Sequence, residues 1–144
     1  MVMSLESTGP LASLLQLTQL GLGGAIAGGR QYMSWVHFRD FTRAITFLLD
    51  RSDITGPVNI ASPNPIPQRE FMATLRSAAG MPFGLRSAAW MVEIGAFLLR
   101  TETELLFKSR RVTPRRLLEA GFIFEHPNWE GAAEALVAQK RRTA

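Results

Sequence analysis

The sequence predicts a fold of helices with a few short strands, in the α/β class, or α+β for this chain by itself. Three observations lead to this prediction. Apolar residues recur at helical spacing in several segments that glycine or proline separates. Short apolar runs such as "VNIA" lie between these segments and are typical of strands. With 144 residues, 47% of them hydrophobic, the chain is long and apolar enough for a packed core.

The first part of the chain is predicted to hold a strand, a helix, a loop and a second strand. "MVMSL" is typical of the end of a buried strand. Pro10 is tolerated in the first turn of a helix, and leucines at helical spacing extend this helix to about Leu20. The five glycines of "GLGGAIAGG" then predict a loop. Tyr32–His37 alternates bulky side chains, as a strand does.

The middle of the chain is predicted to hold two helices around a short strand. Asp40 is expected to cap the first helix, because its short side-chain oxygen can accept a backbone N–H. "VNIA" at 58–61 is expected to be the strand, and "SPNPIP" interrupts regular structure. Pro67 can open the second helix, which Gly80 ends. The apolar face of the first of these helices is Phe41, Ala44, Ile45, Leu48 and Leu49.

The last part of the chain is predicted to be mainly helical. Residues 88–106 have helical spacing. "TPRRLLEAG" predicts a compact helix with Thr113 as its cap, proline in the first position and Gly121 after the end. "FIFEHP" is expected to be extended, and Asn128 is expected to cap the last helix. The basic end of that helix, Lys140–Arg142, suits the negative pole of the helix dipole.

Composition excludes several classes of protein. The chain has no cysteine, which excludes disulfides and thiolate chemistry. The apolar stretch at 11–29 is interrupted by Gln16, Thr18 and Gln19, so it is shorter than the roughly 20 apolar residues of a membrane span. No basic residue precedes Arg30, whereas a secretory signal begins with basic residues. We therefore expect a soluble, cytoplasmic protein without a membrane partner.

The charge of the chain, +4, comes largely from arginine. "KSRRVTPRR" holds five cations between Lys108 and Arg116. Such a cluster can bind phosphate or nucleic acid, but a solvated face is the favoured interpretation. Nucleic-acid binding is the weakest of the functions considered, because the sequence contains no known reading motif.

Neither the glycines nor the histidines predict an active site. A dinucleotide-binding glycine loop follows a strand and opens a helix, whereas these glycines follow a helix and precede a strand. His37 and His126 lack the cysteine or carboxylate partners of a metal site. No serine lies in a nucleophile elbow. The residues alone therefore predict a globular domain, with no metal and no reaction assigned.

Three segments resemble one family. They are "GLGGAIAGGRQYMSWVHFRDFTRAITFLL", "GPVNIASPNPIPQREFMATLRSAAGMP" and "RVTPRRLLEAGFIFEHPNWEGAAEAL". Together they resemble the C-terminal half of the sugar-nucleotide epimerase-like (NAD-dependent epimerase/dehydratase) proteins, within the extended short-chain dehydrogenases/reductases. The third resembles the small C-terminal domain DUF1731. By this resemblance, residues 1–80 are a remnant of the Rossmann and substrate-binding region, and residues 81–144 are the small helical domain.

The resemblance implies an NAD(P)-dependent enzyme family, but its catalytic parts are missing here. The N-terminal half of the family binds NAD(P) through a glycine fingerprint and carries a Tyr-x-x-x-Lys pair. The sole tyrosine of this chain is Tyr32, and four residues later stands Val36. No catalytic residue and no cofactor-binding residue is therefore assigned in this chain, and we expect no hydride transfer from it alone. The resemblance also implies a truncated or split protein in which Met1 falls inside a family domain.

The resemblance places "GGRQYMSWVHFRD" along the wall of the substrate cleft. Arg30 and Gln31 are the better contact candidates, a guanidinium for phosphate and an amide for hydroxyls. Trp35 and His37 complete the candidate substrate-binding set, and they are expected mainly to pack and orient the strand. The implied ligand is a nucleotide sugar or another small anion.

Two other expectations follow. In this family the "VNIA" strand joins the Rossmann sheet, so here its edge and the apolar faces of the first two helices would be partly uncovered. The chain is then expected to associate with itself or with an N-terminal Rossmann half. The alternative to a substrate-binding part of an enzyme is a non-enzymatic interaction module.

Overall fold

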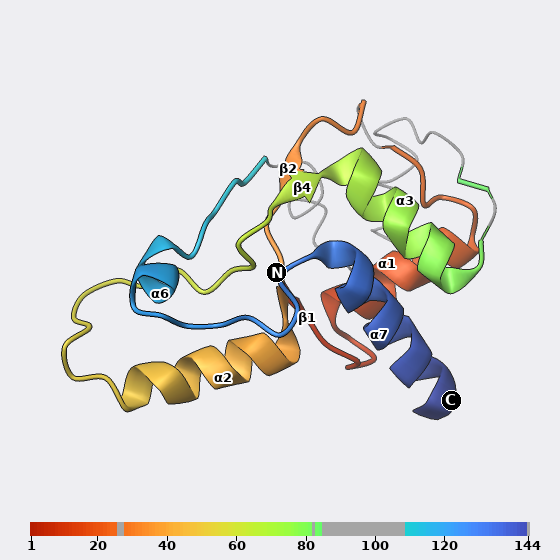
Figure 1. The fold of residues 1–144 in the computed structure, drawn as a ribbon. Coiled ribbons are helices and arrows are strands. Elements are labelled where there is room, and N and C mark those ends of the chain that lie inside the picture. The colour runs from red at the N-terminus through yellow and green to blue at the C-terminus, as the bar shows by residue number, and fades with distance from the viewer. Residues whose placement is uncertain (26–27, 82, 85–108, 144) are drawn as a thin grey trace.

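The computed structural model describes residues 1–25, 28–81, 83–84 and 109–143. Helices dominate, and the strands are short, so the observed class is mixed helix and strand as the sequence predicts. Figure 1 shows the helices arranged around the two small sheets. In chain order the elements are β1 (Val2–Met3), α1 (Pro10–Gln19), β2 (Tyr32–Met33), β3 (Val36–His37), α2 (Phe38–Leu49), β4 (Ile66–Pro67), α3 (Gln68–Ala79), α6 (Arg115–Glu119) and α7 (Trp129–Thr143).

The predicted strand Tyr32–His37 is two strands in two different sheets. β2 pairs antiparallel with β4, placing Tyr32 opposite Pro67. β3 pairs in parallel with β1, placing Val36 opposite Val2. The chain between the two strands bonds elsewhere, since the carbonyl of Trp35 accepts the N–H of Ser62 at 2.6 Å. The change of partner at residues 34–35 therefore divides the segment.

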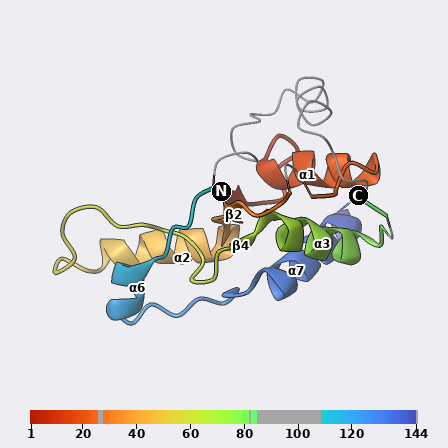
Figure 2. The same ribbon diagram turned by 90° about the horizontal axis from the view of Figure 1, so that it is seen from above.

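The main core lies between α1, α3 and α7. In Figure 2, α3 lies between α1 and α7, and contacts join α3 to both. The Trp129 ring stacks on Phe71 with centroids 3.9 Å apart, and its Nε1–H donates to the Phe71 carbonyl at 2.9 Å. The largest buried side chains of this core are Met3, Leu11, Leu17, Met33, Trp35, Phe71, Met72, Leu75 and Leu136.

A second, smaller apolar cluster joins α2 to α6 and to the chain after α6. Its buried members are Ala44, Leu117, Phe122 and Phe124. Figure 1 shows α2 and α6 side by side, away from the α1–α3–α7 group. The "FIFEHP" segment supplies the two phenylalanines without forming a strand. The predicted division of the chain at residues 80 and 81 stays a prediction.

Two predicted helix caps are wrong. Helix α2 begins at Phe38, so its cap is His37, whose Nδ1 accepts the N–H of Arg39 at 3.2 Å. Asp40 lies inside the first turn, and backbone N–H groups from another segment occupy its carboxylate. Helix α6 begins at Arg115 with Pro114 as its cap and no side-chain cap bond, so Thr113 is not the cap. In contrast, Gly80 ends α3 as predicted, with a φ of 73° that suits glycine.

The expected strand at 58–61 is also wrong. These residues form no strand in the described part of the chain. Val58 and Ile60 instead pack, partly buried, against the second cluster. An extended apolar segment forms a strand only beside a partner with free backbone groups. Here the N–H of the adjacent Ser62 donates to the Trp35 carbonyl. Trp35 lies outside both β2 and β3, so this bond does not add residues 58–61 to either sheet.

The expected exposure of helix faces holds for α2, whereas on the first predicted helix it is confined to Leu20, which is 66% exposed. The leucines of α1 are buried from Leu11 to Leu17. On α2 only Ala44 of the predicted apolar face is fully buried, whereas Ile45 is 40% and Leu49 82% exposed. The predicted helix at 88–106 lies outside the described residues. No helix in the described part is both long and apolar enough to cross a membrane.

Candidate functional site

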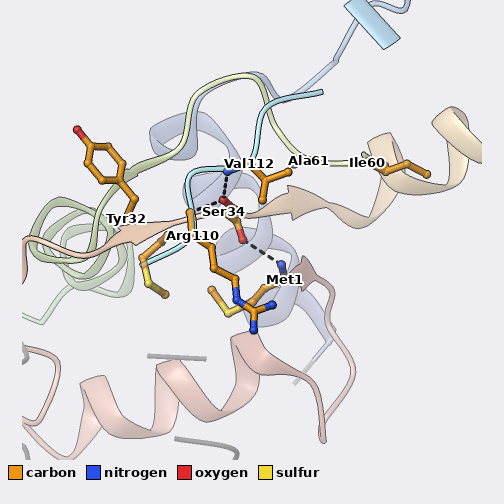
Figure 3. A pocket seen from close by; sticks show the side chains of 8 residues that line it. Met1, Tyr32, Ser34, Ile60, Ala61, Arg110 and Val112 are labelled. Carbon is orange, nitrogen blue, oxygen red and sulfur yellow. Dashed lines mark hydrogen bonds between the residues drawn. The ribbon is translucent and has the colours of Figure 1, made fainter. Parts of the chain in front are cut away.

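A pocket of about 150 Å³ lies where three internal segments of the chain meet Met1. One side comes from β2 and the residue that follows it, a second from residues 60–61, and a third from residues 110–112. Figure 3 shows these side chains around the pocket. The described residues that line it are Met1, Tyr32, Met33, Ser34, Ile60, Ala61, Arg110 and Val112.

Hydrogen bonds fix residues 109–112 alongside residues 32–34. The N–H of Arg110 donates to the Tyr32 carbonyl at 3.0 Å. The Ser34 hydroxyl donates to the Arg110 carbonyl and accepts the Val112 N–H at 2.8 Å (Figure 3). The Ser109 hydroxyl accepts the Tyr32 N–H at 3.1 Å. Ser34 thus joins the two walls, because its single hydroxyl bonds both the Arg110 carbonyl and the Val112 N–H of the facing segment.

The pocket is electropositive. Arg110 lines it, and the neighbouring Arg111 lies over the Tyr32 ring, 4.9 Å from the centroid. The Met1 ammonium donates to the Ser34 carbonyl at 2.9 Å. Burial, and then the charge of Arg110, lowers the pKa of this ammonium. No carboxylate lines the pocket among the described residues, so its cationic groups favour a negatively charged ligand.

The two expected contact residues lie beside this pocket in sequence but do not line it. Arg30 is exposed in the loop before β2. Gln31 is half-buried, and its backbone carbonyl accepts the N–H of Gln68 at 2.8 Å. Their role in binding a ligand stays a prediction.

The structure places the other two candidates in the interior. Trp35 is 1% exposed and packs edge-on against Trp129, with centroids 5.0 Å apart. Its buried Nε1 has no hydrogen-bond partner in the described part of the chain. His37 is 2% exposed and caps α2. Trp35 and His37 are therefore buried and do not belong to the described pocket lining, and direct ligand contact by either stays a prediction.

A second polar cluster surrounds His37. Its ring lies against that of His126, with centroids 3.8 Å apart. Asp40 is fully buried, and its carboxylate accepts hydrogen bonds from the backbone N–H groups of Glu125 and His126 at 2.8 Å each. It also accepts a hydrogen bond from the Arg43 guanidinium at 2.8 Å. Burial, with the charge of His126 and to a lesser extent that of Arg39, lowers the pKa of His37 from 6.5 to about 4, against the opposing effect of Asp40.

The chemistry of this cluster is structural. A His37 ring that is neutral at physiological pH can accept the helix N–H through Nδ1. The Asp40 carboxylate attaches the start of α2 to the backbone that leads into α7. Within the described residues, no group of three or more His, Cys, Asp or Glu side chains could hold a metal ion.

Sequence reasoning missed Tyr32, Ser34 and Arg110 as pocket residues. The signal that existed was the basic cluster from Lys108 to Arg116, which includes Arg110. Nothing in the local pattern shows that residues 109–112 lie beside residues 32–34, which are more than 70 positions away.

The arginines of the basic cluster serve different contacts. Arg115 pairs with Glu119 at 3.0 Å, and Arg116 donates to the Pro57 carbonyl at 2.9 Å. Arg111 lies over Tyr32, and Arg110 lines the pocket. Of these four, only Arg110 lines the pocket, and Arg111 contacts the ring of the pocket residue Tyr32.

The family comparison matches a domain of unknown function, DUF1731, to residues 88–136. Several proteins named epimerase family proteins are similar. YfhF of Bacillus subtilis is 30% identical over 122 residues, which are 83% of this chain and 38% of that protein. Mb2239 of Mycobacterium bovis is 35% identical over 120 residues, 82% of this chain and 38% of that protein. SDR39U1 of Bos taurus is 30% identical over 131 residues, 90% of this chain and 44% of that protein.

Solved structures give the same relationship. Human epimerase family protein SDR39U1 (isoform 2), crystallised with NADPH, matches 95% of this chain and 45% of its own, with a TM-score of 0.81 and 26% identity. A nucleoside-diphosphate sugar epimerase from Corynebacterium glutamicum matches 90% of this chain and 25% of its own, with a TM-score of 0.62 and 21% identity, and so shows the fold alone. The chain spans 38% to 44% of the three curated relatives described above.

Proposed function

Because this chain is homologous to the C-terminal part of epimerase family proteins, we propose that it forms the substrate-binding part of an NAD(P)-dependent, nucleotide-sugar epimerase-like protein. The protein class is that of the extended short-chain dehydrogenases/reductases. The substrate is a nucleoside-diphosphate sugar or a similar small anion.

The observation that carries this proposal is the pocket formed by residues 32–34 and 110–112. Residues 32–34 lie in the first block that resembles the family, and Arg110 directly precedes the third block, which begins at Arg111. Hydrogen bonds through Ser34 and Tyr32 join the two segments into one wall. The pocket is cationic, as binding of a phosphate-bearing substrate requires.

Cofactor binding and hydride transfer belong, in this proposal, to residues that this chain does not supply. The human relative was solved with NADPH. This sequence has neither the glycine fingerprint that holds a pyrophosphate nor the Tyr-x-x-x-Lys pair that moves a proton. Its part in the reaction is to bind and orient the substrate.

The exposed apolar side chains of α2 support a partner for this part. Ile45 and Leu49 of α2 are exposed, and Ile123 beside the helix is 78% exposed. Their apolar surface favours contact with a Rossmann half or with a second copy of the chain.

Ligand titration of the purified chain tests the proposal. Tryptophan fluorescence should change saturably with UDP-glucose, a representative nucleotide sugar, because Trp35 lies next to the Ser34 pocket wall. NADPH, added at the same concentrations, should show no stoichiometric binding. Tight NADPH binding, or no response to UDP-glucose at millimolar concentration, would contradict the proposal.

A further inference from the structure

We propose that the pocket between residues 32–34 and 110–112 is a subsite for one small anionic group, a phosphate or carboxylate, which the guanidinium of Arg110 binds. This inference rests on the proposed function and deepens it by naming the group recognised and the residue that recognises it.

The guanidinium of Arg110 is available to a ligand. Among the described residues it has no ion pair and donates no side-chain hydrogen bond to a carbonyl. Most other arginines in the described part of the chain form either an ion pair or a side-chain hydrogen bond to a carbonyl. Arg43, Arg51, Arg69 and Arg115 pair with carboxylates, and Arg76, Arg116 and Arg141 donate to backbone carbonyls. An unpaired guanidinium at a pocket wall is free to take two oxygens of an anion in its planar fork.

The backbone of Arg110 is held in place before any ligand binds. Its N–H donates to the Tyr32 carbonyl, and its carbonyl accepts the Ser34 hydroxyl. Two residues later, Val112 donates its N–H to the same hydroxyl. Because these bonds anchor the residue on both sides, binding requires ordering of the Arg110 side chain only, which lowers its entropic cost.

The size of the pocket limits the ligand to one small group. Pockets that enclose a drug-sized molecule span roughly 300–1,000 Å³. This one has about 150 Å³, so it can hold one end of a nucleotide sugar and not the whole molecule. A single phosphate or carboxylate fits this volume.

Apolar side chains around Arg110 favour its hydrogen bonds to an anion. Met33, Ile60, Ala61 and Val112 supply apolar surface around it. A charge-assisted hydrogen bond is stronger in such surroundings than in open water. Arg30 and Arg110 are both exposed, but only Arg110 belongs to the described lining of the pocket.

Two single substitutions separate this site from general positive charge. Arg110→Gln removes the guanidinium from the pocket and leaves the Met1 ammonium in place. Arg111→Gln removes the same charge one residue away, where the guanidinium lies over Tyr32 and does not line the pocket. The amide spectra of both proteins show directly whether the fold is retained.

The probe is inorganic phosphate, titrated into the labelled chain at constant ionic strength and followed by amide chemical shifts. In the parent chain the shifts should saturate at millimolar phosphate and centre on Tyr32, Ser34 and Val112. Arg110→Gln should weaken binding at least tenfold, while Arg111→Gln should leave it within about twofold. Equal losses in both variants, or shifts spread over the exposed arginines, would overturn the inference.

UDP-glucose separates failure of the subsite from failure of the proposed function. If Arg110→Gln binds UDP-glucose as well as the parent chain does, the subsite is wrong and the proposed function stands. If the parent chain binds phosphate at Arg110 and does not bind UDP-glucose, the subsite stands and the proposed substrate class is wrong.

Discussion

Asp40 shows how one buried side chain can connect distant parts of this molecule. It was expected to cap its own helix, but its carboxylate accepts two backbone N–H groups from residues 125–126 and one bond from Arg43. A buried acceptor with three charge-assisted or backbone bonds is costly to remove, because each donor loses its partner. Asp40 therefore stabilises the contact between α2 and the segment that leads into α7.

Asp40→Ala should lower the free energy of unfolding by about 2 kcal/mol, since partly buried N–H donors lose their acceptor. Urea unfolding, followed by tryptophan fluorescence, measures this change. Asp53→Ala is the matched control, because Asp53 is 63% exposed in its pair with Arg51 and should contribute far less. Equal effects of the two substitutions would show that the buried contacts of Asp40 carry no special weight.

His37 makes stability depend on pH. Its pKa is about 4 in the folded chain, against 6.5 for an ordinary histidine, because burial and the neighbouring His126 disfavour the charged ring. Between these two values the unfolded chain binds the proton more readily than the folded chain does. Stability should therefore be fully present above pH 6.5 and fall as the pH decreases through about 4.

His37→Asn should flatten this pH dependence. Asparagine retains an acceptor that can cap α2, and it does not titrate. Unfolding free energies measured from pH 7 to pH 4 should therefore fall less steeply in the variant than in the parent chain. An unchanged slope would assign the acid sensitivity to other groups.

At the scale of elements, the helices follow local patterns and the strands do not. Pro10 opens α1 and Gly80 ends α3 as the sequence predicts, because proline and glycine act through their own backbone geometry. The strands are two residues long, and what sets each one is its partner. The division of Tyr32–His37 and the loss of the expected strand at 58–61 have this common cause.

Leu136→Ala in α7 should destabilise the chain by about 3 kcal/mol, because it leaves a cavity in the main core. Leu136 is fully buried in the cluster that α7 shares with α1 and α3. Glu134→Ala changes an exposed position of the same helix and should alter stability by less than about 0.5 kcal/mol. Thermal and urea unfolding of the two variants compare them, and similar losses would mean that α7 contributes through its helicity alone.

At the scale of the whole molecule, the fold has two parts that differ in how completely their apolar side chains are buried. The α1–α3–α7 group buries a large apolar core, whereas α2 leaves Leu49 and much of Ile45 in solvent. The chain also corresponds to less than half of its curated relatives and of the human SDR39U1 structure. The uncovered side of α2 is therefore the surface on which we expect association.

Leu49→Gln combined with Ile123→Gln should reduce self-association without loss of stability. Both side chains are mostly exposed, so their replacement should cost less than about 0.5 kcal/mol each. Light scattering coupled to size-exclusion chromatography measures the mass of each form over a range of concentrations. If the parent chain associates and the double variant does so equally, the contact lies elsewhere on the molecule.

The sequence by itself determined the mixed fold class, most helix positions and the relationship to epimerase family proteins. These depend on local backbone preferences, on apolar spacing and on short blocks of residues that can be recognised in the sequence alone. Only the tertiary structure decided that Asp40 connects α2 to residues 125–126 and that Arg110 lines a pocket with Tyr32 and Ser34. Hydrogen bonds between segments more than 70 positions apart create both arrangements, and no local pattern encodes which distant backbone will supply the partner.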